Sequence, residues 1–284
     1  MADVTAVIIT KNEERNLEDC LKSIITFAKR ILVIDSGSID RTQEIAEKYG
    51  AEFYFHEFET HARQRNWAIE NLNITTKWIL RIDADERLTP NLCEELESVM
   101  QEHAEDNVDG IAAEAWLFFM GRKLKHGGSR KKKVILFKTG KGAIEDRKMD
   151  EHTILYNGVS TEVKEKFLHY DFKNLNEYVK KLNWYAIREL QDYIEVKEGI
   201  NQDLDNPEIR KIRRKKFGLY YKFPKFLRCW LYFFFVYFFK GNFLNGKEGF
   251  VYSFLYHCYY RMLVDAKILE YEKNPQEFEA LTSL

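Results

Sequence analysis

Hydrophobic and polar positions along the first 85 residues follow two alternating periods. Runs that are mostly apolar, typical of strands buried on both faces, occupy 4–9, 31–34, 51–55 and 78–82. Between them apolar residues recur every three or four positions, as at Leu17, Leu21 and Ile24, which predicts helices. Strands of this kind that alternate with helices predict an α/β fold with a mostly parallel sheet covered on both faces.

The pattern continues beyond residue 88. Thr89-Pro90 predicts the start of an acidic helix over 91–103, with proline in the first helical position. Further segments, strands at 110–118 and 133–138 and a helix at 174–197, follow from their apolar spacing. A polar break at 201–207 is the predicted internal boundary.

The last third of the chain is basic and aromatic. Basic residues gather between Arg210 and Lys225 without an acidic one, and an aromatic run follows at 226–239. This run covers about 14 residues and includes Arg228, whereas a membrane span needs about 20. We expect the region to lie at an anionic membrane surface. The alternative is a core helix of a small C-terminal bundle.

Composition and charge exclude several classes of protein. The chain has 284 residues, of which 45% are hydrophobic and 31% charged, so it is not intrinsically disordered. Its formal net charge of -1 gives no whole-molecule field toward nucleic acid, and no nucleic-acid partner is expected. The four cysteines form no C-x-x-C pair, and the N-terminal apolar stretch is too short for a signal peptide. Both observations favour the reducing cytoplasm.

Acidic residues follow the predicted strands, at the edge where parallel sheets bind ligands. Asp83 and Asp85 come directly after the strand at 78–82. Two carboxylates at this spacing can hold a hard divalent cation, and the cation can neutralise a diphosphate. A second Asp-x-Asp, at 203–205, has no strand before it and is interpreted as a solvated loop.

Two further candidates each allow two interpretations. Asp35, at the end of the second strand, can accept from a base N–H or a ribose hydroxyl, or it can form a turn and cap the next helix. Arg63 and Arg65 can pair with phosphate oxygens as planar forks, or they can lie on a solvated helix face.

Four segments in this order and spacing resemble the family 2 inverting glycosyltransferases: VIITKNEE at 7–14, IDSGSIDRT at 34–42, Arg65-Asn66, and IDADE at 82–86. The closer resemblance is to the branch that adds a sugar to the lipopolysaccharide inner core, and to related capsule and exopolysaccharide transferases. The resemblance implies a GT-A fold, a Rossmann-like, mostly parallel sheet flanked by helices. The predicted parts are a catalytic domain at 1–200, with a nucleotide-sugar half at 1–110 and an acceptor half at 111–200, and a helical, membrane-associating region at 201–284.

The resemblance also implies roles for residues at the strand ends, where a nucleotide-diphosphate sugar would bind. Thr10, Asn12 and Glu13 would line the nucleoside pocket. Asp35 would hold the base, and Arg65 would approach the nucleotide or its diphosphate. Asp83, with Ala84 beside it, would reach the ribose and the metal, and Asp85 would coordinate a divalent cation, Mg²⁺ or Mn²⁺, directly.

An inverting transfer also needs a general base near the acceptor hydroxyl. The run Met149-Asp150-Glu151-His152 resembles a motif of capsule-type transferases, which makes Asp150 the first choice of base and Glu151 the second. The lipopolysaccharide branch places His before Glu here, so the choice of base stays open, as does contact of His152 with the metal or the leaving diphosphate. The alternative is that this acidic cluster only pairs with Arg147 and Lys148.

The sequence therefore predicts a metal-dependent hexosyltransferase. It would move a hexose from a nucleotide sugar, most simply a UDP-sugar, to a lipid-anchored saccharide at the inner face of the cytoplasmic membrane, in lipopolysaccharide or other cell-surface polysaccharide biosynthesis. The basic loop at 122–133 would contact an anionic acceptor or form a solvated hairpin. One alternative is a sugar nucleotidyltransferase, which would be expected to carry a glycine-rich basic loop where this chain has Thr10 to Glu14. The other is a catalytically inactive, membrane-associated nucleotide-sugar-binding protein.

Overall fold

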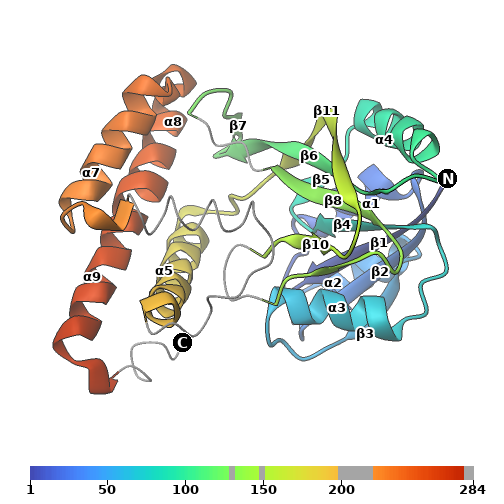
Figure 1. Ribbon diagram of the computed structural model, residues 1–284, viewed down its shortest axis with the longest axis horizontal. Coiled ribbons are helices and arrows are strands. Elements are labelled where there is room, and N and C mark those ends of the chain that lie inside the picture. Colours follow the sequence, from blue (N-terminus) through green and yellow to red (C-terminus); the bar gives the residue numbers. More distant parts are fainter. Residues whose placement is uncertain (128–131, 147–150, 198–219, 278–284) are drawn as a thin grey trace. The chain divides into compact units, whose positions relative to one another are not determined.

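The computed structural model describes residues 1–127, 132–146, 151–197 and 220–277 (Figure 1). The chain forms two compact units, one of residues 1–118 and 130–171 and the other of residues 119–129 and 172–284. The predicted boundary at 201–207 lies outside the described residues. The division of the chain into a donor half, an acceptor half and a membrane-associating region stays a prediction.

The first unit is built on a mixed β-sheet with the strand order β3-β2-β1-β4-β8-β6-β11-β5. Its parallel part consists of β1 (Ala2–Thr10), β2 (Ala28–Asp35), β3 (Glu52–Phe55) and β4 (Trp78–Asp83). The remainder consists of β5 (Glu86–Arg87), β6 (Val108–Phe119), β8 (Lys132–Lys138) and β11 (Val159–His169). Strand β8 runs antiparallel to β4 and β6, β11 runs parallel to β6, and β5 runs antiparallel to β11. A separate antiparallel pair joins β9 (Gly142–Ile144) and β10 (Thr153–Leu155).

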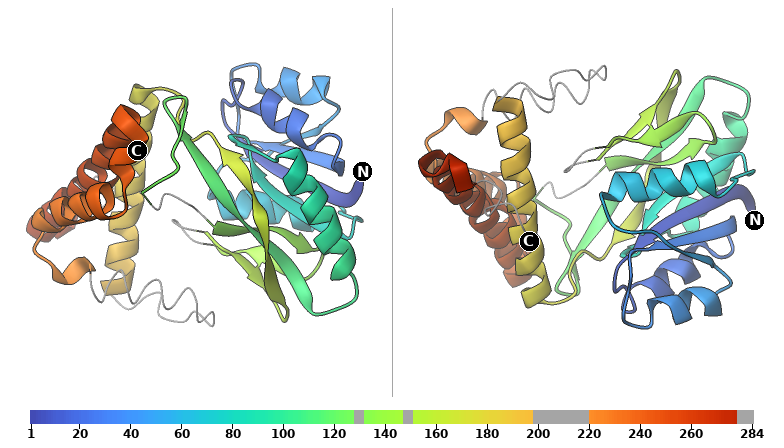
Figure 2. Two further views of the ribbon diagram at one scale, coloured as in Figure 1. Left: turned by 90° about the horizontal axis from the view of Figure 1, so that it is seen from above. Right: turned by 90° about the horizontal axis from the view of Figure 1, so that it is seen from below.

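Helices cover both faces of this sheet, because the apolar strands present side chains alternately to each side. One core cluster joins alternate residues of β1, such as Val4, Ala6 and Ile8, to α1 (Leu17–Ile24), α2 (Thr42–Lys48) and α4 (Pro90–Glu102). The other joins Val7 and its neighbours to α3 (His61–Asn71). Figure 2 shows α4 over the sheet from above and α3 over it from below. The predicted α/β class, with helices on both faces of the sheet, is confirmed.

The strand register sets the place of the site. Ile9 of β1 lies opposite Asp83 of β4, and Thr10 lies opposite Asp35 of β2. The ends of three adjacent parallel strands therefore bring these polar residues to one edge of the sheet.

The second unit is helical and rich in aromatic residues, as predicted. Its elements are β7 (Arg122–Lys123), α5 (Leu175–Lys197), η1 (Tyr220–Lys222), α7 (Leu227–Phe234), η2 (Phe235–Phe239), η3 (Asn242–Asn245), α8 (Gly246–Tyr252), η4 (Ser253–Tyr259), α9 (Tyr260–Lys273) and η5 (Pro275–Glu277). Helix α7 continues into η2, and α8 continues through η4 into α9, so η3 joins two helical arms. The Phe233 ring of the first arm packs against Phe250 and Phe254 of the second. None of the helices described combines the length and apolarity that crossing a membrane requires.

Buried ion pairs connect the helices of this unit. Arg228 of α7 binds the Asp265 carboxylate of α9, and both side chains are at most 3% exposed. Glu189 of α5 accepts from Arg261 of α9 at 2.8 Å and is also hydrogen bonded to Tyr260. Buried charges are costly unless they are paired, so each pair fixes the position of one helix against another.

We expect Asp265→Ala to lower the free energy of unfolding by about 3–5 kcal/mol, because it leaves the Arg228 guanidinium buried without its counter-ion. Urea denaturation followed by circular dichroism measures the loss. Glu272→Ala is the matched control, since it removes the half-exposed partner of Lys225 and should cost no more than about 1 kcal/mol. Equal costs for the two variants would contradict the structural role of the buried pair.

Candidate functional site

Asp35 holds together the turn that follows β2. Its carboxylate is 2% exposed and accepts hydrogen bonds from Thr10 Oγ1 at 2.8 Å, from the Gly37 and Ser38 amides at 2.8 and 2.7 Å, and from Ser38 Oγ at 2.5 Å. A carboxylate offers about four lone-pair positions, and these donors occupy them. The turn interpretation accounts fully for this buried charge. A base N–H reaches Asp35 only by displacing one of these donors, so recognition of the base by Asp35 stays a prediction.

The loop after β1 is joined to the same turn. The Asn12 amide donates to Ser38 Oγ at 2.7 Å, and Asn12 Oδ1 accepts from the Ile39 amide at 2.9 Å. Asn12 adopts a left-handed conformation with φ 54°, which asparagine tolerates better than most residues. The Glu13 amide donates to Thr42 Oγ1 at 2.9 Å. The residues predicted to line the nucleoside pocket therefore form one hydrogen-bonded rim at the sheet edge.

Asp83 lies between two cations. Arg65 of α3, which is 2% exposed, forms an ion pair with Asp83 Oδ1. Lys133 Nζ of β8 lies 3.0 Å from Asp83 Oδ2 and 2.7 Å from Glu86 Oε2. The buried position of Arg65 excludes the solvated-face interpretation for this residue. Arg63 fits that interpretation, because it is exposed and pairs with Asp146 at 2.9 Å.

The pKa values of the two carboxyl groups in this network shift in opposite directions. Burial acts to raise the pKa of Asp83, but the charges of Lys133 and Arg65 outweigh it and hold the pKa well below its ordinary value. Burial raises the pKa of Glu86, and Lys133 only partly opposes this. Asp83 is therefore ionised at neutral pH.

One donor in this network has no hydrogen-bond partner. The Arg65 Nε–H is buried and finds no acceptor in the described part of the chain. A buried donor of this kind is costly to leave unsatisfied, so it favours an anionic ligand beside α3.

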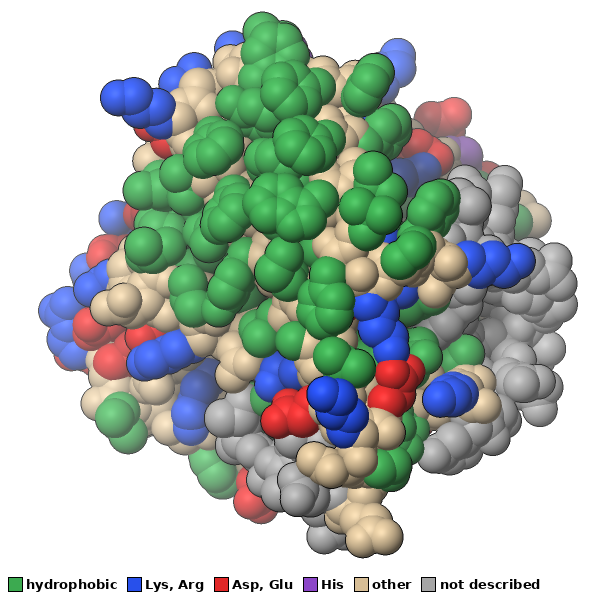
Figure 3. Space-filling model, turned by 90° about the vertical axis from the view of Figure 1, so that its left-hand side faces the viewer, with side chains coloured by type: hydrophobic (Ala, Val, Ile, Leu, Met, Phe, Trp, Pro, Cys, Tyr) green, Lys and Arg blue, Asp and Glu red, His purple; other side chains and the backbone are tan. Residues whose placement is uncertain are grey.

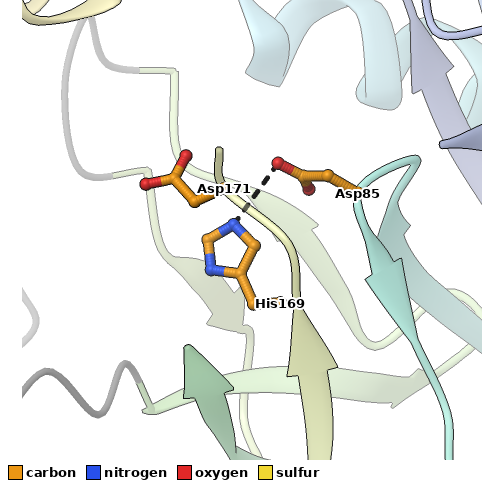
Figure 4. Close-up of side chains that lie close together, drawn as sticks. All are labelled: Asp85, His169 and Asp171. Atoms are coloured by element: carbon orange, nitrogen blue, oxygen red, sulfur yellow. Dashed lines mark ion pairs between the residues drawn. The ribbon is translucent and has the colours of Figure 1, made fainter. Parts of the chain in front are cut away.

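Asp85 points to a different group of residues, shown in Figure 4. Its Oδ2 lies 3.4 Å from His169 Nε2, and one ligand atom each from Asp85, His169 and Asp171 lies within 4.8 Å of the others. Two carboxylates and an imidazole suit Mn²⁺ and related divalent ions, so the donor set fits the predicted cation.

Strand pairing brings these residues together. Glu86 of β5 lies opposite His169 at the end of β11, and the Tyr170 amide donates to the Asp85 carbonyl at 2.8 Å. Sequence reasoning missed His169 and Asp171. The sequence signal for these ligands is the His-x-Asp at the end of β11. His169 lies on the same face of the strand as the buried Val163 and Phe167.

The other predicted ligands and binding residues lie elsewhere. Within the described ranges the metal-capable group includes Asp85 but neither Asp83 nor His152. The His152 carbonyl accepts from the Glu145 amide at 2.8 Å, beside the β9–β10 pair. Ala84 is 3% exposed and belongs to the hydrophobic core, so its side chain packs beneath the site.

Of the two candidate bases, Glu151 lies among the described residues. Asp150 lies outside the described residues, as do Arg147 and Lys148. The Glu151 side chain is 10% exposed, and its Oε1 lies 3.8 Å from His61 Nδ1. The Glu151 carbonyl accepts from the buried Arg81 at 3.2 Å, which fixes the backbone there.

We expect Lys133→Met to destabilise the protein in a pH-dependent way. Without this cation the pKa values of Asp83 and Glu86 both rise. A carboxyl group whose pKa is lowered by folding stabilises the folded state above its unfolded pKa, and one whose pKa is raised destabilises it there. Both changes therefore cost stability at neutral pH. The Asp83 side chain is 36% exposed and its share is reduced by solvent, so most of the cost, about 3 kcal/mol, comes from the buried Glu86. The Glu86 part of the cost shrinks as the pH falls through the raised pKa of this group, above its ordinary value of 4.5. The Asp83 part shrinks only further down, toward the lowered pKa of that group.

Urea denaturation across this pH range measures the effect. Lys132→Met is the matched control, because Lys132 precedes Lys133 in β8 and pairs with the exposed Glu162 of β11. A cost for Lys133→Met that is constant with pH would contradict the assigned charge network.

Comparisons with known proteins show which family the sequence matches. The family model described as Glycosyl transferase family 2 matches residues 5–153, more than half of the chain. An uncharacterized glycosyltransferase of Rickettsia felis is 27% identical over 281 residues, covering 95% of this chain and 90% of that protein.

Among solved structures, residues 1–349 of TarS from S. aureus match with a TM-score of 0.45 and 14% identity, over 97% of this chain and 92% of that one. Glucosyl-3-phosphoglycerate synthase from Mycobacterium tuberculosis, crystallised with Mn²⁺, UDP and glucosyl-3-phosphoglycerate, matches with a TM-score of 0.32 and 17% identity, over 40% of this chain and 44% of that one. By its family match the chain belongs to glycosyltransferase family 2, as its sequence motifs predict.

Proposed function

We propose that this enzyme is an inverting, metal-dependent hexosyltransferase that uses a UDP-sugar donor and a lipid-linked saccharide acceptor. The observation that carries the proposal is the convergence of Asp85, His169 and Asp171 at the carboxyl ends of the parallel strands. This is the edge at which α/β sheets bind nucleotides. The resemblance to lipopolysaccharide and capsule transferases supports the choice of sugar, nucleotide and pathway.

The donor would lie along the rim formed by the loops after β1 and β2. Thr10, Asn12 and Glu13 line its nucleoside side, and Asp83 lies where the ribose would reach. Arg65 supplies a guanidinium with an unsatisfied buried N–H, which suits a diphosphate oxygen. Lys133 adds a second positive charge beside Asp83.

In this proposal Asp85, His169 and Asp171 hold the divalent cation, and Asp83 stays with its two cations. When bound, the metal would stabilise the negative charge that develops on the departing diphosphate. His169 is fixed for this role by the pairing of β11 with β5.

The acceptor hydroxyl would be activated by a carboxylate of the 150–151 pair. Its oxygen attacks C1 of the sugar in line, forming the new glycosidic bond as the bond from C1 to the diphosphate oxygen breaks. The proton passes to the carboxylate, and the bonding electron pair leaves with the diphosphate. Asp150 is our first choice, and Glu151 beside His61 is the second.

The lipid-linked acceptor would place the enzyme peripherally on the cytoplasmic face of the membrane. A sugar nucleotidyltransferase is disfavoured by the family match. A catalytically inactive nucleotide-sugar-binding protein would use the same three ligands, and the sugar-transfer assay below distinguishes it from the enzyme.

We expect Asp85→Ala to abolish metal-dependent donor binding without unfolding the protein. Loss of an outer-shell partner already weakens metal binding by about 10–100-fold, and loss of a direct ligand should exceed that. Calorimetric titration with UDP-, GDP- and dTDP-sugars, with and without Mn²⁺, measures donor binding. Titration with Mn²⁺ alone gives a readout that is independent of turnover.

Asp205→Ala is the control for this experiment, since Asp205 belongs to the other Asp-x-Asp of the chain. His169→Ala should weaken Mn²⁺ binding in the same way as Asp85→Ala, and His152→Ala should not. Unchanged Mn²⁺ affinity in the Asp85 and His169 variants would overturn the metal assignment.

For the base, we expect one of Asp150→Asn and Glu151→Gln to lower kcat by about 10²–10⁴-fold while donor affinity stays unchanged. The reason is that the base acts on the acceptor and not on donor binding. Transfer of radiolabelled sugar to lipids extracted from the producing cell measures kcat. Full activity in both variants would mean that the base lies outside this segment.

A further inference from the structure

Helix α7 and its π-helical continuation η2 are apolar on two sides. One side is buried in the second unit, where Cys229, Phe233 and Val236 pack. The other side is exposed and carries large apolar residues, among them Trp230, Phe234, Phe235, Phe238 and Phe239. Phe239 is 83% exposed. The aromatic run is therefore a core element on one side only.

The exposed apolar side chains continue beyond this helix. Phe243 and Leu244 of η3 are exposed, as are Phe250 and Phe254 on the second arm. Figure 3 shows a broad apolar surface on the side of the molecule where α7, α8 and α9 lie. We call this surface, formed by the exposed apolar residues between Phe223 and Phe254, the aromatic face. A patch of this extent on a water-soluble protein marks an interaction site.

Buried polar contacts fix the turn that carries Phe243 and Leu244. Asn242 and Asn245, which flank them, are at most 2% exposed. Asn245 Oδ1 accepts from the Lys125 amide at 2.9 Å, and its Nδ2 donates to the His126 carbonyl at 3.0 Å. The outward position of the two apolar side chains is thus built into the fold of this unit.

The exposed charges of this region are cationic. Lys222, Lys240 and Lys247 are exposed. The one acidic residue between Tyr220 and Phe254 is Glu248, and it pairs with Arg122 at 3.2 Å. Anionic lipid headgroups attract such lysines, while phenylalanine and tryptophan enter the headgroup and acyl boundary. Self-association through this region would leave the lysines without an acidic partner, because the same region of a second copy has only Glu248, which pairs with Arg122.

We propose that the aromatic face docks on an anionic lipid bilayer, with its phenylalanine and tryptophan side chains in the interface and its lysines among the headgroups. Docking would bring the enzyme to its lipid-anchored acceptor. In this respect the inference deepens the proposed function and rests on it. Membrane binding is measurable without donor, metal or acceptor, so failure of either proposal is seen separately.

The test is co-sedimentation of the full chain with phosphatidylcholine vesicles that contain or lack phosphatidylglycerol. We expect binding that is stronger with phosphatidylglycerol. The triple variant Phe234→Ser, Phe238→Ser and Phe239→Ser should reduce the partition coefficient by at least about tenfold, because three interfacial aromatic groups are lost. Phe55→Ser is the matched control, since Phe55 of β3 is 66% exposed in the first unit, and it should bind as the parent does.

Two further readouts separate the contributions. Lys240→Glu with Lys247→Glu should weaken binding several-fold only where phosphatidylglycerol is present. Lipids with brominated acyl chains should quench Trp230, and the quenching should disappear in Trp230→Phe. Absence of vesicle binding by the parent chain, or equal binding by the triple variant, would overturn the proposal. A dimer without vesicles that the triple variant dissociates would also overturn it, and would assign the face to a second copy.

Discussion

The ion pairs of Asp83 with Arg65 and Lys133 are the contact on which the site depends. The three residues come from the end of β4, from α3 and from β8, and the Lys133 ammonium also reaches Glu86. Arg65 and Glu86 are buried charges that would be costly without partners, so the network is stable only when all of the elements are in place. It fixes the short turn between β4 and β5, and this turn presents Asp85.

The Asp-x-Asp spacing has a direct physical meaning in this turn. Asp83 and Asp85 are two residues apart and serve different partners, two cations for the first and His169 with Asp171 for the second. Ala84 between them packs into the hydrophobic core, which keeps the two carboxylates apart and oriented. Asp83 pairs with both cations. Asp85 is therefore available to form the metal-capable group with His169 and Asp171.

The sequence predicts the parts of this site that depend on local pattern, and misses those that depend on pairing between distant segments. Apolar runs predict β1, β2 and β4, and their ends predict the edge where Asp35 and Asp83 lie. His169 was missed because β11 alternates apolar residues with lysine and glutamate, and only its pairing with β5 brings it to Asp85. The sequence predicts Lys133 at the end of a basic loop, because no local pattern shows that β8 lies beside β4. The hydrogen bonds within the turn account for Asp35. A motif match identifies this residue but does not tell whether it stabilises the turn or recognises a base.

The aromatic run shows the same limit in another form. Apolar composition alone fits a core helix and an interfacial helix equally, because it does not tell which side chains find partners. Phe233 packs against Phe250 and Phe254, whereas Phe238 and Phe239, a few residues along the same arm, are more than half exposed. Both interpretations therefore describe one side of the same helix. The buried side already supplies the packing that holds the arm in place. The exposed aromatic side chains therefore cost free energy in water without stabilising the fold of this unit. An apolar partner removes that cost.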